Sequence, residues 1–505
     1  MRVAIADVGT NSCHLLIGEF KTGQVSSYHI IESLKDRTRL GEHLQEGRLT
    51  EEGYERLKTA LSRFKVIAEV NEVSDFVVYA TSATRDAENG PEVVQRLHEE
   101  IGVNMQVISG QKEGELTYMG AASSVEFAER NLLLDLGGGS LEVVLGNKHT
   151  ARKVVSVPLG GVRLREMFLK KDPATPAVLS RIEKHILDTL APQLADFALQ
   201  PGTKVIGSSG SMESVAAILA TRSGLASLGI NGFNFRVSDL QALYEELRHK
   251  TLPERLKTPG LDPKRADIIV VSLLVLLTTL KLLGATQVTV STGALREGMM
   301  IEYLAREADY EAQLSPRQRS VLEVAERFRF DAAHARHVTQ TAKELFTHLL
   351  EHVRFLPEAR SMLRAAGMLH EIGLLVGQSS HHKHSQYLIR HSGLRGYEPW
   401  QIEVIALVAR YHRKTPPRPT HTEYQTLSKE QQLLVRQLSA ILRVADGLDR
   451  AHTQNSIIHS LIKEGTGWVL YVTPGHIVNL WGAKEKSDLW NQVFGPLNIL
   501  QWDEV

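Results

Sequence analysis

The stretch LLLDLGGGSLEVV, residues 132–144, decides the fold because it joins two apolar runs through a turn rich in glycine. The first run ends around Asp135, the turn covers residues 137–140, and the second run begins at Leu141. This pattern predicts two buried strands joined by a tight turn with little side-chain bulk. It therefore places one carboxylate beside a bare backbone loop at the end of a buried strand.

The N-terminal stretch RVAIADVGTNSCHLLIGEF, residues 2–20, repeats this plan. We expect a strand at 2–6, a polar turn at 7–12 and a second strand at 13–20. Both copies place an aspartate and a glycine-containing turn with a hydroxyl residue between apolar strands. An internal duplication would place the two turns opposite each other.

Other apolar strands run into a polar turn and then a helix. Strands are predicted at 75–80 and 105–108, the second followed by a helix from about residue 112, and the segments 203–220 and 287–304 have the same form. Strands that alternate with helices over about 300 residues predict an α/β fold with mixed sheets.

The pattern changes after residue 305. Residues 314–452 have a helical period with few strand signals, interrupted by a proline-rich loop at 414–424. Eleven of the 21 histidines lie between His334 and His421, which marks this segment as a second place to look for chemistry. Alternation returns from about residue 455, which predicts a small α+β domain at the end.

Composition limits the classes of function. A chain of 505 residues is long enough for three or four domains. The 58 basic and 58 acidic residues cancel, which argues against bulk attraction to nucleic acid or anionic lipid. Cys13 is the single cysteine, no signal peptide precedes the first strand, and the apolar run 268–280 is too short to span a bilayer. We expect a cytoplasmic protein in which 268–280 is a buried helix.

The turns have the chemistry of phosphate sites. The start of a helix leaves backbone N–H groups unpaired, and glycine lets a phosphate approach them closely. Turns of this kind occur in ADVGTNS, ATSATR, LDLGGGS, GSSGS and STGALREG. A single glycine turn is weak evidence, but a set of them at strand ends, two of which form a repeat, indicates binding of phosphoryl groups.

Carboxylates at the same strand ends could hold a hard cation. Asp7 and Asp135 each precede a glycine turn, where Mg²⁺ could be bound beside phosphate oxygens. Glu142 follows on the outgoing strand and could add another oxygen ligand. The alternatives are that each aspartate caps its own turn and that Glu142 is a solvated strand residue.

These motifs, with ISGQKEGELTYMG, resemble those of the exopolyphosphatase and guanosine pentaphosphate phosphohydrolase (Ppx/GppA) family of the actin-like ATPase superfamily. The match is specific in motif and order over residues 1–305. The resemblance implies two actin-like (ribonuclease H-like) domains at 1–124 and 125–305, a helical HD-like domain at 306–452 and a small α+β domain at 453–505.

The resemblance also assigns roles to residues. Glu113 matches the general base, Asp135 and Glu142 the Mg²⁺ ligands with Asp7 as a further one, and Arg85 a phosphate clamp. The phosphate-binding set is Thr10, Asn11, Ser12, Arg85, Gly137, Gly138, Gly139, Ser140, Ser208, Ser209 and Gly210. From the residues alone, Glu113 could instead be a capping carboxylate after Ser109. Glu115 departs from the family pattern and would affect the pKa of Glu113.

The implied activity is release of terminal phosphate from inorganic polyphosphate by water attack with Mg²⁺. The alternative is 5′-phosphohydrolysis of guanosine pentaphosphate (pppGpp) by the same residues. A third class is an ATP-binding actin-like regulator or kinase. The resemblance further implies a homodimer and leaves room for a monovalent cation, with no nucleic-acid partner and no membrane span.

The histidine-rich segment resembles the HD phosphohydrolase pattern, with His337, His370, Glu371 and Asp446 as candidate ligands of a second metal. Glu371 stands where that pattern has aspartate. Imidazole and carboxylate groups on neighbouring helices suit Zn, Fe or Mn. His384 and His412 are further candidates.

The alternative reading of the same segment is a basic surface, with the remaining histidines in helix packing. A channel for the polyphosphate chain would be formed by His381, Lys383, Arg410, Arg413 and Lys414, with Arg418 nearby. Such a surface would hold a long chain by charge, with an affinity that falls as salt rises.

Overall fold

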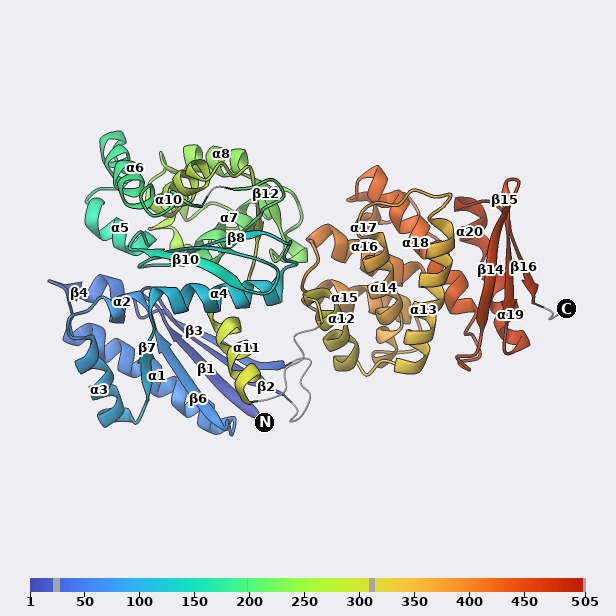
Figure 1. Ribbon diagram of the computed structural model, residues 1–505, viewed down its shortest axis with the longest axis horizontal. Helices are drawn as coiled ribbons and strands as arrows, with labels where there is room; N and C mark the ends of the chain where they lie inside the picture. Colours follow the sequence, from blue (N-terminus) through green and yellow to red (C-terminus); the bar gives the residue numbers. More distant parts are fainter. Residues whose placement is uncertain (21–27, 198, 308–313, 503–505) are drawn as a thin grey trace. The chain divides into compact units, whose positions relative to one another are not determined.

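The structure, a computed structural model, describes residues 1–20, 28–197, 199–307 and 314–502 (Figure 1). The chain divides into two compact units, Met1–Pro316 and Arg317–Val505. The first unit contains both predicted α/β domains, and the second contains the predicted helical segment together with the C-terminal tail.

The first sheet of unit 1 has the strand order β3-β2-β1-β6-β7. Its strands are β1 (Arg2–Val8), β2 (Cys13–Glu19), β3 (His29–Asp36), β6 (Asp75–Ala80) and β7 (Met105–Val107), beside a small ribbon of β4 (Leu44–Gln45) and β5 (Arg48–Leu49). The three N-terminal strands are antiparallel, and β6 and β7 continue the sheet parallel to β1. The predicted hairpin at residues 2–20 is confirmed.

Apolar side chains alternate along β1 and so enter two different cores. Ala4 and Ala6 pack with α1 (Glu51–Val70) and α3 (Gly90–Ile101) on one face of the sheet. Val3 and Ile5 pack on the other face against α11 (Leu295–Glu307). The sheet is therefore covered on both sides, as Figure 1 shows.

The second sheet of unit 1 repeats the first, with the order β10-β9-β8-β11-β13 and β12 added at the edge. Its strands are β8 (Asn131–Leu136), β9 (Leu141–Gly146), β10 (Ala151–Val157), β11 (Lys204–Ser208), β12 (Asn234–Arg236) and β13 (Gln287–Val290). Again three antiparallel strands are followed by parallel ones. The duplication predicted from the two Asp-Gly turns therefore extends to whole sheets.

The other helices of unit 1 are α2 (Ser82–Arg85), α4 (Gly110–Ser124), α5 (Gly161–Phe168), α6 (Pro176–Leu190), α7 (Ser209–Arg222), α8 (Val237–Leu247), α9 (Leu252–Arg255) and α10 (Ile269–Leu282). Helix α10 is buried among them in the core of the second sheet, which confirms the buried helix predicted at 268–280.

The predicted division places residues 125–305 in the second domain, whereas helix α11, within that range, packs on the first sheet. It follows the last strand of the second sheet, yet Leu295 and Met299 pack with Val3 and Ile5 of the first. It also lies tightly against α4, where a methyl group on Gly298 would be 1.8 Å from a backbone oxygen of α4. The chain thus returns to the first sheet before unit 1 ends. A single domain boundary after residue 124 therefore does not separate the two sheets with all their helices.

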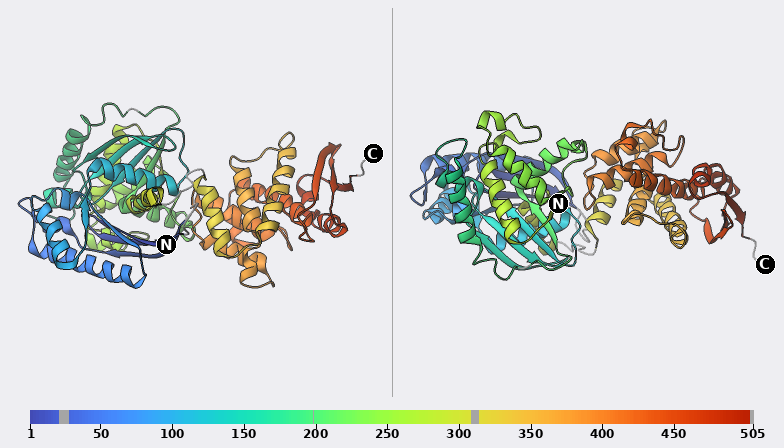
Figure 2. Two further views of the ribbon diagram at one scale, coloured as in Figure 1. Left: turned by 60° about the horizontal axis from the view of Figure 1, so that its bottom comes forward. Right: turned by 90° about the horizontal axis from the view of Figure 1, so that it is seen from above.

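Unit 2 begins with helices, as the helical period predicted (Figure 2). They are α12 (Pro316–Arg327), α13 (Ala332–Leu349), α14 (Ala359–Leu369), α15 (His381–His391), α16 (Pro399–Tyr411), α17 (Thr422–Gln425) and α18 (Lys429–Gly447). The tail adds β14 (Ile457–Glu464), β15 (Gly467–Thr473), α19 (Ile477–Glu485), α20 (Asp488–Val493) and β16 (Leu497–Gln501).

The tail shares one hydrophobic core with the helices. Trp468 and Trp490 belong to the same buried cluster as Leu442 of α18. In this tail sheet β15 is antiparallel to β14 and parallel to β16. Across the described residues, no helix combines the length and the apolar character needed to cross a membrane.

Candidate active site

The two Asp-Gly hairpins of unit 1 have the same register and the same closing bond. In the first, Asp7 pairs with His14 and the amide of Gly9 donates to the Ser12 carbonyl over 3.1 Å. In the second, Asp135 pairs with Glu142, and Gly137 donates to Ser140 over 3.0 Å. Residues 9–12 and 137–140 are therefore equivalent turns.

Both turns line a single cavity of about 340 Å³. The predicted residues that line it are Asp7, Thr10, Asn11, Ser12, Glu113, Asp135, Gly137, Gly138, Gly139, Ser140, Ser209 and Gly210. Residues from four separate segments of the sequence thus meet at one place, as the strand-end pattern predicted.

Glycine lets the second turn approach the first half of unit 1. A methyl group on Gly139 would lie 2.4 Å from Ser82 Oγ and 2.5 Å from Thr10 Oγ1. The amides of Gly138 and Gly139 donate no hydrogen bond to another group in the described part of the chain. Because both amides are unpaired beside the cavity, the turn can donate to the oxygens of an anion.

Buried carboxylates face one another in this site. Burial and the nearby Glu113 raise the pKa of Asp7 to about 7. The pKa of Asp135 is also raised by burial, against a hydrogen bond of 2.8 Å that Ser208 Oγ donates to its Oδ1. Burial, Glu113 and Asp135 raise the pKa of Glu142 well above its usual range. The group therefore holds more negative charge than its protein surroundings neutralise.

The charge and chemistry of this group fit a divalent cation. Oδ1 of Asp7 is buried and has no hydrogen-bond partner among the described residues. Carboxylate oxygens are the ligands that Mg²⁺ prefers, and an ion held near them would offset their mutual repulsion. Asp7 and Asp135 line the cavity, whereas Glu142 lies behind it and accepts a hydrogen bond of 2.8 Å from Ser156 Oγ.

Glu113 lies in the first turns of α4, and its carboxylate binds Arg85. Arg85 Nη1 donates to Glu113 Oε2 over 2.8 Å and to the carbonyl of Ile108 over 3.1 Å. Ser109 is the residue that caps α4, through a hydrogen bond from the amide of Lys112. Burial raises the pKa of Glu113 to about 7, although the Arg85 guanidinium lowers it. A carboxyl group with this pKa can exchange a proton with water near neutral pH.

Three predicted residues take part without lining the cavity. Arg85 holds Glu113, Ser208 holds Asp135, and Glu142 pairs with Asp135 across the hairpin. Their assignment to phosphate or metal stays a prediction. Glu115 does not line the cavity either, and accepts a hydrogen bond from Gln111 on the surface of α4.

Sequence reasoning missed the basic residues of the cavity. Lys35, Arg265 and Arg296 line it. A methyl group on Gly210 would be 1.8 Å from the guanidinium of Arg265, so this arginine lies directly over the glycine turn. Arg296 stands in STGALREG, one of the turns that the sequence had marked, whereas no local pattern distinguishes Lys35 or Arg265.

The histidines of unit 2 form a different set from the predicted one. His334, His370, Glu371 and Asp446 come together, with ligand atoms within 4.8 Å of one another. His337 lies outside this group, and His334, three residues earlier on α13, takes the place that was predicted for it. His412 joins a second group with Glu371 and His381, whereas His384 belongs to neither.

The residues of the predicted basic channel have unequal exposure. Lys383, Lys414 and Arg418 are exposed, Arg410 and Arg413 are half-buried, and His381 is buried. His381 therefore faces the interior of unit 2, and the cations alone form the surface.

Duplicated sheets whose Asp-Gly turns, carboxylates and cations line one cavity define an actin-like enzyme that hydrolyses phosphoric anhydrides. The family model described as "Ppx/GppA phosphatase family" matches residues 17–307. A second model, "Ppx/GppA phosphatase, domain III", matches residues 317–478. The chain belongs to the Ppx/GppA phosphatase family.

The names of similar proteins describe two activities, a pyrophosphatase and an exopolyphosphatase. A guanosine-5′-triphosphate,3′-diphosphate pyrophosphatase of Photobacterium profundum is 27% identical over 412 residues, which are 81% of this chain and 80% of the relative. The crystal structure of an exopolyphosphatase from Cytophaga hutchinsonii is 29% identical with a TM-score of 0.56, and covers 62% of this chain and 100% of its own. A family member from Aquifex aeolicus is 28% identical with a TM-score of 0.52, covering 61% of this chain and 98% of its own.

Proposed function

We propose that the cavity of unit 1 releases terminal phosphate from inorganic polyphosphate with Mg²⁺. The observation that carries the proposal is that carboxylates, cations and two equivalent glycine turns line one cavity. Asp7, Glu113 and Asp135 supply carboxylates, and Lys35, Arg265 and Arg296 supply cations. Glu213 lines the cavity as well, near those cations. Phosphoryl transfer depends mainly on positioning and charge neutralisation, and these lining residues offer both.

Each group has a distinct part in this proposal. Asp7 and Asp135 would hold Mg²⁺, which when bound supplies positive charge beside the phosphate oxygens. The amides of Gly138 and Gly139 donate to the terminal phosphoryl group, and Lys35, Arg265 and Arg296 bind the rest of the chain. Because Arg85 occupies Oε2 of Glu113, the other oxygen is left to accept a proton from the attacking water.

We favour polyphosphate over a nucleotide as the substrate because the described residues that line the cavity include no Phe, Tyr or Trp. Aromatic side chains are a common means of binding a base by stacking. A polyphosphate chain needs only cations and amide donors. The second candidate substrate is pppGpp, which the name of the Photobacterium relative and its match over 81% of this chain favour.

Phosphate release from long-chain polyphosphate and from pppGpp, measured side by side with the full chain, tests the proposal. The wild type should release phosphate from polyphosphate, with the larger kcat/KM of the two substrates. Glu113→Gln should lower kcat by about 10²- to 10⁴-fold, the usual contribution of a general base. The matched control Glu115→Gln, two residues away on the same helix, should retain the activity of the wild type.

The outcomes separate the two parts of the proposal. A larger kcat/KM for pppGpp would overturn the substrate and leave the site intact. Full activity of Glu113→Gln on both substrates would overturn the assignment of the base.

A further inference from the structure

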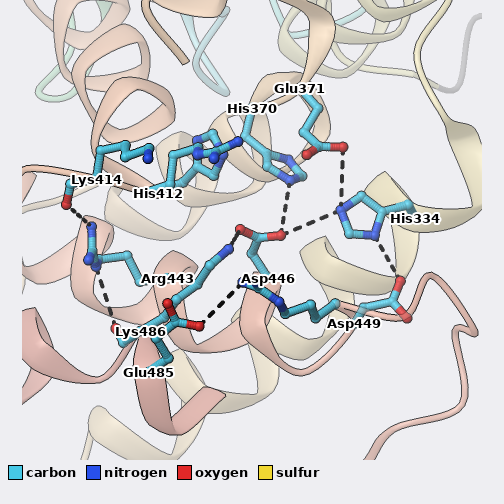
Figure 3. A network of polar contacts seen from close by, with 12 residues as sticks. His334, His370, Glu371, His412, Lys414, Arg443, Asp446, Asp449, Glu485 and Lys486 are labelled. Atoms are coloured by element: carbon cyan, nitrogen blue, oxygen red, sulfur yellow. Dashed lines mark hydrogen bonds and ion pairs between the residues drawn. The ribbon is translucent and has the colours of Figure 1, made fainter. Parts of the chain in front are cut away.

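The buried histidine and carboxylate group of unit 2 lies where three helices meet (Figure 3). His334 comes from α13, His370 and Glu371 directly follow α14, and Asp446 comes from α18. His334 and His370 are 1% and 0% exposed. In Figure 3 their rings and the carboxylates of Glu371 and Asp446 point toward one another. The arrangement therefore gathers nitrogen and oxygen donors at one buried point.

The distances between these donors fit coordination of an ion better than hydrogen bonding. His334 Nε2 lies 3.7 Å from Glu371 Oε2 and 3.6 Å from Asp446 Oδ1, and His370 Nε2 lies 3.8 Å from the same Oδ1. Ligands at about 2.0–2.2 Å from one ion in a tetrahedral arrangement lie about 3.4 Å apart. His334 Nε2, His370 Nε2 and Glu371 Oε2 are buried with no hydrogen-bond partner among the described residues.

A second group adjoins the first through Glu371. Glu371, His381 and His412 also have ligand atoms within 4.8 Å of one another. His381 Nε2 lies 3.8 Å from Glu371 Oε1 and 3.4 Å from His412 Nε2. The two oxygens of Glu371 thus face different groups, Oε2 toward His334 and Oε1 toward His381.

The outward nitrogen of every one of these four rings is already bound. His370 Nδ1 contacts the Gly367 carbonyl at 2.7 Å, His412 Nδ1 the Ala409 carbonyl at 2.6 Å, and His381 Nδ1 the Gln378 carbonyl at 3.3 Å. His334 Nδ1 lies 2.8 Å from Asp449 Oδ2. Histidines that ligate metals have their second nitrogen bound in this way.

These outward bonds fix which ring nitrogens carry the protons. A carbonyl oxygen only accepts, so Nδ1 of His381 and His412 must donate, and in neutral rings both Nε2 atoms then carry lone pairs. Two lone pairs that face each other at 3.4 Å repel unless a cation lies between them. In a neutral ring His370 Nε2 also carries a lone pair, because Nδ1 donates to the Gly367 carbonyl. It repels the carboxylate of Asp446 unless a cation lies between them.

We propose that unit 2 binds two transition-metal ions, bridged by Glu371. His334, His370 and Asp446 complete one site, and His381 and His412 complete the other. Mixed imidazole and carboxylate ligands select Zn, Fe or Mn over Mg²⁺, so this centre is distinct in chemistry from the all-carboxylate group of unit 1.

Two neighbouring cations make the sites unequal. Lys486 Nζ forms an ion pair with Asp446 Oδ2, which leaves Oδ1 to face the histidines. Arg413 Nη1 lies 3.3 Å from both ring nitrogens of His381 and places a positive charge beside the second site. We therefore expect the first site to bind its ion more tightly than the second.

The test measures metal content of the full chain after loading with Zn²⁺, Mn²⁺ or Fe²⁺ in excess Mg²⁺ and removal of free ions. The wild type should hold two ions, and His370→Asn and His412→Asn should each lose one. Glu371→Gln, which removes a ligand charge from both sites, should lower both affinities by at least about tenfold. X-ray absorption of the zinc form should show Zn–N bonds of about 2.0–2.1 Å.

Two controls keep the test specific. His337→Asn, on the same helix as His334 but outside both groups, should retain two ions. Asp135→Asn should also retain two ions, because it changes only the carboxylate group of unit 1. Fewer than two ions per chain in the wild type, or equal loss in His337→Asn and His370→Asn, would overturn the proposal. Thermal unfolding of each variant in excess chelator separates loss of ligands from loss of fold.

Discussion

Asp7 and Asp135 occupy the same position in two hairpins of one design, and both line the same cavity. Asp7 is paired across its hairpin with His14, and Asp135 with Glu142. Their partners differ in one respect: Asp135 accepts a hydrogen bond from Ser208, whereas Oδ1 of Asp7 has no partner among the described residues. Asp7 therefore depends more than Asp135 on a cation for compensation of its charge.

Asp7→Asn should raise the Mg²⁺ concentration for half-maximal phosphate release by about tenfold or more, equivalent to about 1.4 kcal/mol of ion binding. The same change should raise the melting temperature of the metal-free protein at pH 8. The reason is that the pKa of Asp7 is raised to about 7, so the folded state loses stability as pH rises through that value and the buried carboxyl ionises. Magnesium titrations of activity and melting curves with and without Mg²⁺ check both effects. An unchanged magnesium requirement would contradict the assignment.

Arg85 should act on Glu113, which predicts a change in the pH profile. The unprotonated carboxylate is the base, so kcat/KM should fall as pH drops through about 7. Since the guanidinium of Arg85 lowers the pKa of Glu113, Arg85→Gln should move this acidic limb to higher pH, and Arg85→Lys should move it less. Profiles of kcat/KM between pH 5.5 and 9 provide the measurement. A raised KM with an unmoved limb would instead support the phosphate-clamp role that the sequence predicted for Arg85.

Local sequence signals were sufficient for the hairpins, because alternation and Asp-Gly turns are encoded within about a dozen residues. They were not sufficient for Arg265, which reaches the cavity only because the loop before α10 folds over Gly210. The position of α11 was equally hidden, since its packing on the first sheet follows from contacts with residues almost three hundred positions away.

The histidine group shows the same limit on a smaller scale. His334 and His337 are three residues apart on α13, close to one turn, so both lie on a similar face of the helix. The packing register of α13 against α14 and α18 decides whether His334 or His337 meets Asp446. That register cannot be read from a single sequence. The ligand types were therefore predictable, and one of the ligands was not.

Gly160 tests how closely the second glycine turn must be held. A methyl group on Gly160 would lie 2.3 Å from the backbone of Gly138 and Gly139, where no side chain can rotate away. Gly160→Ala should displace the turn, lower kcat/KM by at least about tenfold and destabilise unit 1 by about 1–3 kcal/mol. Gly137→Ala is the matched control, because its nearest contact would be an ordinary 3.5 Å. Kinetics and chemical denaturation measure the two effects, and equal behaviour of the variants would show that the turn tolerates displacement.

The exposed cations of unit 2 give the last prediction. Lys414 and Arg418 lie on the surface, and a polyphosphate chain long enough to contact them would gain affinity by release of bound counterions. Replacing both with Gln should raise KM several-fold for chains of hundreds of phosphates, leave KM for short chains unchanged, and reduce the salt dependence of long-chain binding by a slope of about two. The control pair Lys429→Gln and Lys463→Gln removes exposed charges elsewhere on the same unit. Equal losses on long and short chains would contradict a role in chain binding, because a surface that recognises length can act only on substrates that reach it.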